Sequence, residues 1–212
     1  MFRDRADAGR RLAEKLATYR HDAPVIIGLP RGGVPVAHAV ARALHAPLDV
    51  IVVRKLGTPD NPELGFGAIS EEDVVVFNQG VVRALGIDES DIDRAIARER
   101  LTLESRRAAL RSRHEQIDLK DRVVIVIDDG IATGIDARAA CRVVRARGAK
   151  EIVLAVPVAP ADWTTTMTRE ADVLVAVEVD PEFMAVGSYY EDFTQVSDDD
   201  VEHCLDSACL TP

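Results

Sequence analysis

Repeated runs of consecutive apolar residues, rich in Val and Ile, most constrain what this chain can fold into. Six such runs occupy residues 24–29, 48–53, 74–78, 122–127, 151–158 and 173–179. Apolar residues that follow one another without polar alternation indicate strands that are covered on both faces. The runs therefore predict strands in the interior of a sheet that helices enclose.

Helical patterns separate several of these runs and define the fold class. Residues 33–44 and 136–147 have helical spacing, and Gly148 follows the second segment as an expected C-cap. Strand, helix and strand in this order predict an α/β fold with a mostly parallel central sheet and helices on both faces. The chain has 212 residues, of which 47% are hydrophobic, so we expect residues 1–212 to form a single domain.

Two segments depart from this rhythm. Residues 88–116 are charged and Arg-rich, and we interpret them as an inserted helical arm whose charges lie on a solvated face. Residues 180–212 are predicted to form a small C-terminal hood. Its aromatic residues are Phe183, Tyr189, Tyr190 and Phe193. They predict either a small core within the hood, which is the commoner case, or a stacking wall for a planar ligand.

Composition excludes several classes of function. The formal net charge is −10 and the sequence pI is about 5.0, which argues against nucleic acid as a partner. Three cysteines without a CxxC pair favour a reducing cytoplasm over a disulfide framework or a zinc site. The first 16 residues are charged and periodic, unlike a signal peptide. No apolar stretch approaches the ~20 residues of a membrane span, so we expect a cytoplasmic protein without a membrane partner.

Two adjacent acids, Asp128 and Asp129, directly follow the apolar run at 122–127. Ligands of open α/β sheets bind at the carboxyl ends of strands, and carboxylates accept hydrogen bonds from sugar hydroxyls. The next residues, Gly130 to Gly134, lead into a predicted helix, whose first N–H groups favour a phosphate. The acids and this turn therefore predict a site for a ribose and its phosphate.

Two other stretches carry features of an anion site. In "GLPRGG", Arg31 stands between a proline and the pair Gly32–Gly33, where free backbone N–H groups can cradle an anion. Arg54 and Lys55 follow the apolar run at 48–53 and are expected at a strand's carboxyl end. The Gly-, Pro- and Asn-rich stretch after them, up to residue 69, is predicted to be a mobile loop.

The acid-pair stretch resembles the signature of type I phosphoribosyltransferases, and the chain is most similar to bacterial predicted phosphoribosyltransferases of unassigned substrate. Four apolar residues, two acids, three small or apolar residues and Thr-Gly occur in the same order. The resemblance implies Mg²⁺-dependent transfer of 5-phosphoribosyl from phosphoribosyl pyrophosphate to a nitrogenous base, with release of pyrophosphate. It implies that Mg²⁺ is held mainly through the substrate, so no dedicated metal ligands are expected. It also implies a homodimer.

The resemblance assigns roles residue by residue. Catalytic roles fall to Arg31, Lys55, Asp128 and Asp129. The residues implied to contact ribose, phosphate or pyrophosphate are Arg31, Gly32, Gly33, Arg54, Lys55, Asp128, Asp129, Gly130, Ile131, Ala132, Thr133 and Gly134. A non-proline cis peptide is expected near Arg31–Gly32, and the loop after Lys55 is expected to close over the reaction centre and exclude water.

Two positions depart from the family pattern. Ala132 stands where 6-oxopurine transferases carry an acid, which lowers the expectation of a hypoxanthine or guanine acceptor. Asp136 stands where many relatives carry a threonine whose hydroxyl donates to the 5′-phosphate. A carboxylate there repels phosphate unless it turns outward and caps the helix. Asp136 therefore keeps open an alternative function, a non-catalytic sensor or regulator that binds phosphoribosyl pyrophosphate or a nucleotide.

Two further classes fit the sequence poorly. Mg²⁺-dependent phosphohydrolases usually separate their acids by one residue, so that both lie on one side of a strand. Dinucleotide-binding oxidoreductases need G-x-G-x-x-G after the first strand, and "GLPRGG" lacks that spacing. The acceptor, the oligomeric state and the role of residues 88–116 are not determined by the sequence.

Overall fold

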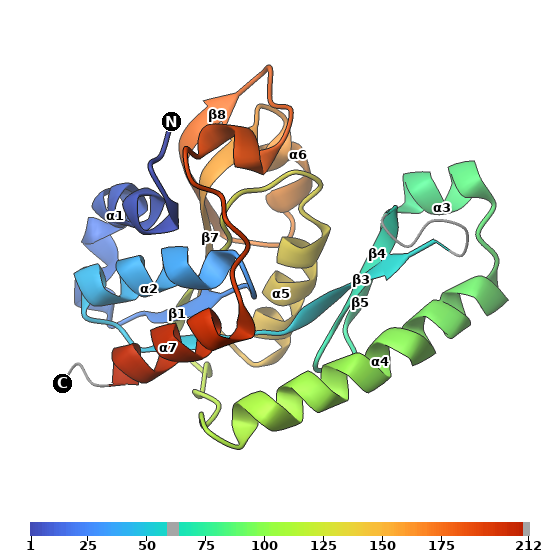
Figure 1. Ribbon diagram of the computed structural model, residues 1–212, viewed down its shortest axis with the longest axis horizontal. Coiled ribbons are helices and arrows are strands. Elements are labelled where there is room, and N and C mark those ends of the chain that lie inside the picture. The colour runs from blue at the N-terminus through green and yellow to red at the C-terminus, as the bar shows by residue number, and fades with distance from the viewer. Residues whose placement is uncertain (59–63, 210–212) are drawn as a thin grey trace.

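The computed structural model describes residues 1–58 and 64–209, and in them a parallel sheet of five strands forms the centre (Figure 1). The spatial order is β2-β1-β6-β7-β8, and every neighbouring pair is parallel. The strands are β1 (Val25–Gly28), β2 (Leu48–Val50), β6 (Val123–Ile127), β7 (Glu151–Pro160) and β8 (Val173–Asp180). The α/β fold with a mostly parallel central sheet is confirmed.

Helices cover both faces of this sheet. The helices are α1 (Arg5–Lys15), α2 (Gly33–Leu44), α5 (Ile135–Ala146), α6 (Trp163–Met167) and α7 (Asp198–Cys209), with 3₁₀ turns η1 (Ala17–Asp22) and η2 (Val186–Tyr189). Ile26 and Ile125 face α1, α2 and α7 in one buried cluster. Ile27 and Val124 face α5 and α6 in another. Successive residues thus point to opposite faces of the sheet, and helices shield both faces from water. This explains why the apolar runs are unbroken.

A second, antiparallel sheet lies beside the first and was not predicted. It consists of β3 (Val53–Gly57), β4 (Gly65–Ser70) and β5 (Val75–Phe77), in that order. The run at 74–78 was expected in the parallel sheet, but its strand β5 pairs with β4. Residues 56–69 were expected to form a loop, but Leu56, Gly57 and residues 65–69 belong to the β3–β4 hairpin. Residues 59–63 of the expected lid lie outside the described residues.

Helices α3 (Gln79–Leu85) and α4 (Glu89–Arg111) follow the second sheet. The Asp88 carboxylate accepts a hydrogen bond from the Asp91 N–H at 2.8 Å and caps α4. Ala95 and Leu103 of α4 pack on Leu56 and Phe66 of the sheet. Helix α4 and the second sheet therefore form one arm, which extends away from the central sheet (Figure 1).

A buried ion pair joins the end of this arm to the central sheet. Arg111 donates to the Asp49 carboxylate at 2.7 Å and to the Val50 carbonyl at 3.0 Å. The Ile117 N–H donates to the other oxygen of Asp49 at 3.0 Å. Asp49 is 2% exposed, so its charge depends on Arg111 for compensation.

We therefore predict that Arg111→Ala lowers the free energy of unfolding by about 3–5 kcal/mol, because an uncompensated carboxylate is left buried. Urea denaturation followed by circular dichroism measures the change. Arg107→Ala, at an exposed position of the same helix, is the matched control and should stay within ~0.5 kcal/mol of wild type. A loss below about 1 kcal/mol for Arg111→Ala would show that the pair does not hold the arm.

Candidate functional site

The acid pair lies where β6 ends, against the loop that follows β1. The Leu29 N–H donates to the Ile127 carbonyl at 2.9 Å, so the two chain segments meet. A Cβ atom on Gly32 would lie 2.0 Å from Asp129 Oδ2, and one on Gly33 would lie 2.8 Å from Asp128 Cα. Only glycine fits at either position. The structure therefore brings the "GLPRGG" loop and the acid pair into direct contact, as the ligand site requires.

The loop after β1 contains a non-proline cis peptide, which joins Pro30 and Arg31. The resemblance implied a cis peptide near Arg31–Gly32, and the observed cis bond is the one directly before it. Arg31 projects towards α7, where its guanidinium lies 3.9 Å from the Asp198 carboxylate. The Arg31 side chain is one-third exposed, so it remains accessible to an anion.

The turn after the acid pair leads directly into α5. Gly134 precedes the helix with φ of +67°, and a Cβ atom there would also lie 2.3 Å from Met167 Cε. Gly134 has no side chain that could cap the helix, so the N–H groups of the first turn lack intrahelical partners and are available to a ligand. Gly130 is equally constrained, since its Cβ would lie 2.6 Å from Val186 Cγ1 of the tail.

A cavity of about 160 Å³ lies over this turn. Its walls are formed by Asp128, Gly130, Ile131, Ala132, Thr133, Gly134, Ile135, Asp136, Ala137 and Val186. Every residue that the sequence assigned to the phosphate turn, from Gly130 to Gly134, lines it. Asp128 lines the cavity as well, whereas Asp129 does not.

Arg5 is a site residue that the sequence did not reveal. Its Nε donates to Asp129 Oδ2 at 2.9 Å, and its Nη1 donates to the Thr194 carbonyl at 2.8 Å. The guanidinium lies 4.0 Å from the centre of the Phe193 ring, within range of a cation–π contact. Arg5 lies 124 positions before Asp129 in a charged helical segment, so no local pattern distinguishes it.

The aromatic residues of the tail form a packed cluster. Tyr190 is 6% exposed and packs on Phe2, and its hydroxyl donates to the Asp129 carbonyl at 2.6 Å. Phe183 stacks on Tyr189 at 5.6 Å between ring centres. The interpretation as a small core is therefore correct. The alternative, a stacking wall open to a planar ligand, is wrong for Tyr190.

The carboxylates of the site lie in an unfavourable environment for charge. Burial raises the pKa of Asp128 well above its usual value, and the neighbouring Asp129 and Asp136 raise it further. Burial also raises the pKa of Asp129, against which the Arg5 hydrogen bond acts. The pKa of Asp136 is raised by burial, and Lys55 and Arg54 offset part of that effect.

Arg54 and Lys55 lie on β3 of the second sheet, and the expectation that they end a strand of the central sheet is wrong. Arg54 donates from Nε to Glu99 of α4 at 3.0 Å. Both cations act electrostatically on Asp136 of α5. The hairpin therefore brings the basic dipeptide to the site by a route that strand order alone does not predict.

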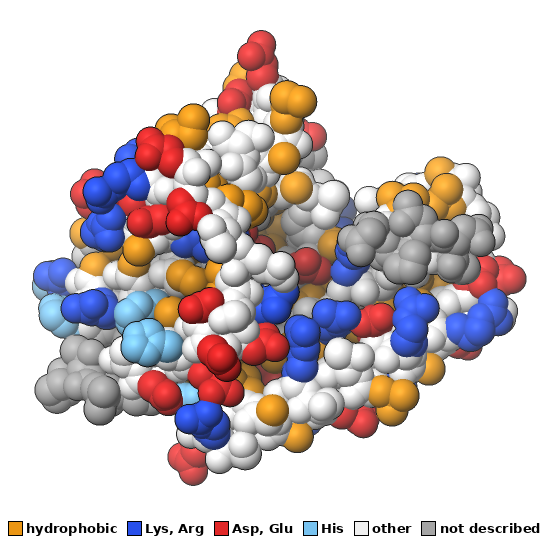
Figure 2. All heavy atoms as spheres, in the orientation of Figure 1, with side chains coloured by type: hydrophobic (Ala, Val, Ile, Leu, Met, Phe, Trp, Pro, Cys, Tyr) orange, Lys and Arg blue, Asp and Glu red, His pale blue; other side chains and the backbone are white. Residues whose placement is uncertain are grey.

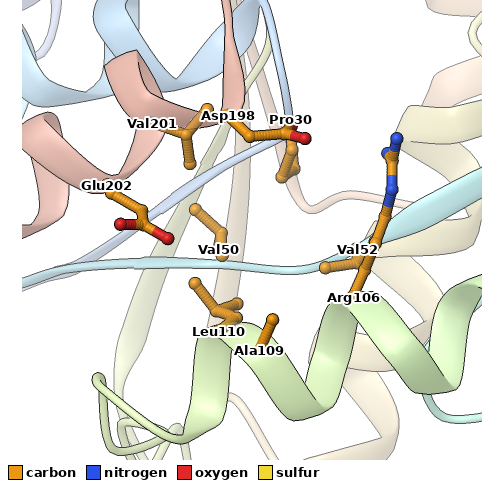
Figure 3. A pocket seen from close by; sticks show the side chains of 9 residues that line it. All are labelled: Pro30, Val50, Val52, Arg106, Ala109, Leu110, Asp198, Val201 and Glu202. Atoms are coloured by element: carbon orange, nitrogen blue, oxygen red, sulfur yellow. The ribbon is translucent and has the colours of Figure 1, made fainter.

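A second cavity, of about 120 Å³, lies between the arm and the tail (Figure 3). Val50, Val52 and Leu110 form apolar walls, and Pro30 brings the loop after β1 to its edge. Its other lining residues are Arg106, Ala109, Asp198, Val201 and Glu202. Figure 2 shows a hollow between the central body and the arm, with basic side chains in a row on the side of the arm.

Metal clusters and membrane spans are both absent from residues 1–58 and 64–209. These residues contain no group of three or more His, Cys, Asp or Glu side chains placed to hold a metal ion. None of their helices combines the length and apolar character needed to cross a membrane.

The fold and the cavity define an α/β protein with a cavity at the carboxyl edge of a parallel sheet. The phosphoribosyl transferase domain family matches residues 3–192, and the chain belongs to this family. The resemblance inferred from the acid-pair stretch is thereby confirmed.

Individual relatives agree with this assignment. A Mycobacterium tuberculosis H37Rv protein, provisionally named a phosphoribosyl transferase, is 49% identical over 208 residues, which are 98% of this chain and 47% of that protein. The chain thus spans about half the length of the curated relatives it matches. The crystal structure of the protein TT1426 from Thermus thermophilus is 44% identical, covers 97% of each chain and has a TM-score of 0.80. The purine phosphoribosyltransferase of Pyrococcus horikoshii is 22% identical, covers 90% of each chain and shares the fold at a TM-score of 0.50.

The raised pKa of Asp128 predicts a pH-dependent cost to stability. The pKa of Asp128 in the folded state lies above its unfolded value of about 3.9, so the folded state holds the proton more tightly. Stability therefore falls as the pH rises from the unfolded pKa through the folded pKa. Asp128→Asn removes that cost. We expect its gain in unfolding free energy over wild type to be larger at pH 8 than at pH 4.5.

Urea denaturation at the two pH values measures this difference. Asp162→Asn, at an exposed position before α6, is the control and should follow wild type at both values. A gain for Asp128→Asn that is the same at both values would contradict the assignment of a raised pKa to Asp128.

Proposed function

We propose that this chain is a Mg²⁺-dependent phosphoribosyltransferase that transfers 5-phosphoribosyl from phosphoribosyl pyrophosphate to a nitrogenous base. The observation that carries the proposal is the meeting of Asp128, a glycine turn and an uncapped helix start at one cavity. A vicinal diol next to a phosphate needs acceptors beside a cluster of N–H donors. Membership of the family supports the transferase class.

Asp128 is the acid best placed to hold a ribose hydroxyl, since it lines the cavity and its Oδ1 accepts the neighbouring Asp129 N–H at 2.8 Å. Asp129 shares one oxygen with Arg5 and does not line the cavity, so its Oδ1 would serve the second hydroxyl only once the carboxylate turns towards the ligand. The 5′-phosphate would rest on Thr133, Gly134 and the first N–H groups of α5. These contacts would allow the site to discriminate a phosphorylated ribose from a free sugar.

The leaving pyrophosphate would lie on the loop after β1. The N–H groups around Gly32 and Gly33 and the guanidinium of Arg31 would bind its oxygens, with Lys55 and Arg54 facing it from the arm. The bond from C1 to the pyrophosphate oxygen breaks, its electron pair stays on pyrophosphate, and the acceptor nitrogen forms the new bond to C1. Cations fixed where that charge accumulates lower the barrier.

The residues present fit Mg²⁺ that is bound mainly through substrate oxygens and water, as this ion prefers. The partly buried carboxylates of Asp128 and Asp136 lie at the cavity, beside the proposed substrate site. When bound, Mg²⁺ neutralises charge on the leaving pyrophosphate. A homodimer in the cytoplasm remains part of the proposal.

The acceptor would have room in the second cavity, between the arm and the tail (Figure 3). Its apolar walls suit the faces of a planar base, while Arg106, Asp198 and Glu202 offer a donor and two acceptors at the rim. Pro30 lines this cavity too, so an acceptor there would adjoin the proposed pyrophosphate site.

A non-catalytic sensor of phosphoribosyl pyrophosphate is the second candidate. Two observations favour it: the carboxylate of Asp136 in the phosphate turn, and the ion pair that occupies one oxygen of Asp129. Release of pyrophosphate with any member of a panel of nucleobases would identify an enzyme. Binding without release across the panel would identify a sensor.

We predict that Asp128→Asn weakens binding of phosphoribosyl pyrophosphate in the presence of Mg²⁺ by about 10- to 100-fold, because hydrogen bonds to charged groups contribute about 1.5–3 kcal/mol. Isothermal titration calorimetry measures the dissociation constant. Asp118→Asn, an exposed position before β6, is the control and should bind like wild type. Equal affinities for wild type and Asp128→Asn, or no binding to either, would overturn the assignment of the ribose site.

A further inference from the structure

The phosphate turn contains a carboxylate oxygen without a partner. Oδ1 of Asp136 is buried and accepts no hydrogen bond from any of the residues the structure describes. Asp136 lies in the first turn of α5 and lines the cavity together with Thr133 and Gly134. The outward, helix-capping orientation that would have removed it from the phosphate does not occur, since the cap position belongs to Gly134.

The charges around Asp136 come from two segments, β3 and the loop after β6. Arg54 and Lys55 act on it from β3, and Asp128 acts from the loop after β6. The two cations favour an anion in this part of the cavity, whereas the two carboxylates oppose one. A phosphate with two negative charges would therefore be attracted by the free N–H groups at the start of α5 and repelled by the buried Oδ1 of Asp136.

We propose that this turn accepts a phosphate monoester only together with one additional proton, which is shared between Asp136 Oδ1 and a phosphate oxygen. The proton turns two repelling acceptors into a donor and an acceptor, and it gives the unpartnered oxygen its hydrogen bond. The proposal rests on the proposed function, since it assumes that the 5′-phosphate of the ligand occupies this turn.

The chemistry of both partners suits such sharing. Burial raises the pKa of Asp136, and the second pKa of a phosphate monoester lies near ~6. The phosphate can therefore hold the proton near neutral pH at small cost, and the raised pKa of Asp136 favours sharing it. Above that range the ligand must take the proton from solvent, so affinity falls by up to about tenfold for each pH unit.

The test is isothermal titration of ribose 5-phosphate, which lacks the pyrophosphate, at pH 6.5, 7.5 and 8.5. Each titration is repeated in two buffers that differ in ionisation enthalpy, which yields the number of protons taken up. Wild type should take up close to one proton at pH 8.5 and bind at least about tenfold more weakly there than at pH 6.5. Asp136→Asn and Asp136→Thr should take up none and should bind more tightly than wild type at pH 8.5.

Controls keep the outcomes distinct. Asp162→Asn, exposed and outside the cavity lining, should behave like wild type. Thermal unfolding verifies that the two position-136 variants are folded, and either of them alone suffices. Phosphoribosyl pyrophosphate with Mg²⁺, titrated into the same proteins, tests the proposed function separately.

Three results would overturn the proposal. Ligand binding to wild type without proton uptake would leave the proposed function intact and refute proton sharing. Uptake that persists in Asp136→Asn would assign the proton to another group, such as Asp128. Absence of binding by ribose 5-phosphate and by phosphoribosyl pyrophosphate at every pH would refute the proposed function and this inference with it.

Discussion

The contact between two glycines and two acids is the constraint on which the site depends. Gly32 lies against the Asp129 carboxylate and Gly33 against the Asp128 backbone, at separations that no Cβ atom tolerates. This contact joins the carboxyl ends of β1 and β6, which are neighbours in the sheet. Parallel pairing aligns the two strand ends, so loops that lie far apart in sequence meet at one edge of the sheet.

Placing several carboxylates at this edge of the sheet destabilises their charged forms, and the fold compensates these charges only in part. Arg5 compensates Asp129, and Arg54 and Lys55 act on Asp136, whereas Asp128 receives its hydrogen bond from a backbone N–H. Burial therefore raises the pKa of all three acids. Such incompletely compensated charge is typical of a site that a ligand completes, because the ligand supplies the missing donors.

The sequence predicts best what depends on local pattern. The central sheet follows from unbroken apolar runs, and α2 and α5 follow from helical spacing with Gly148 behind the second helix. The β3–β4 hairpin escaped prediction because Gly65 and Gly67 lower strand propensity, although Gly67 is required beside the Val76 carbonyl, 2.7 Å from where its Cβ would lie. The Arg5 contact also escaped, since only the tertiary fold brings the first helix to the acid pair.

The two acids are adjacent in sequence but differ in environment. Asp128 lines the cavity, whereas Asp129 points to Arg5, and the carbonyl of Asp129 accepts the Tyr190 hydroxyl. Adjacent residues leaving a strand face opposite sides, so one acid meets the ligand cavity and the other meets the chain's own first helix and tail. Arg5 also binds the Thr194 carbonyl, so the tail is attached to the same ion pair. Asp129 therefore attaches the tail to the carboxyl end of β6 through Arg5 and Tyr190.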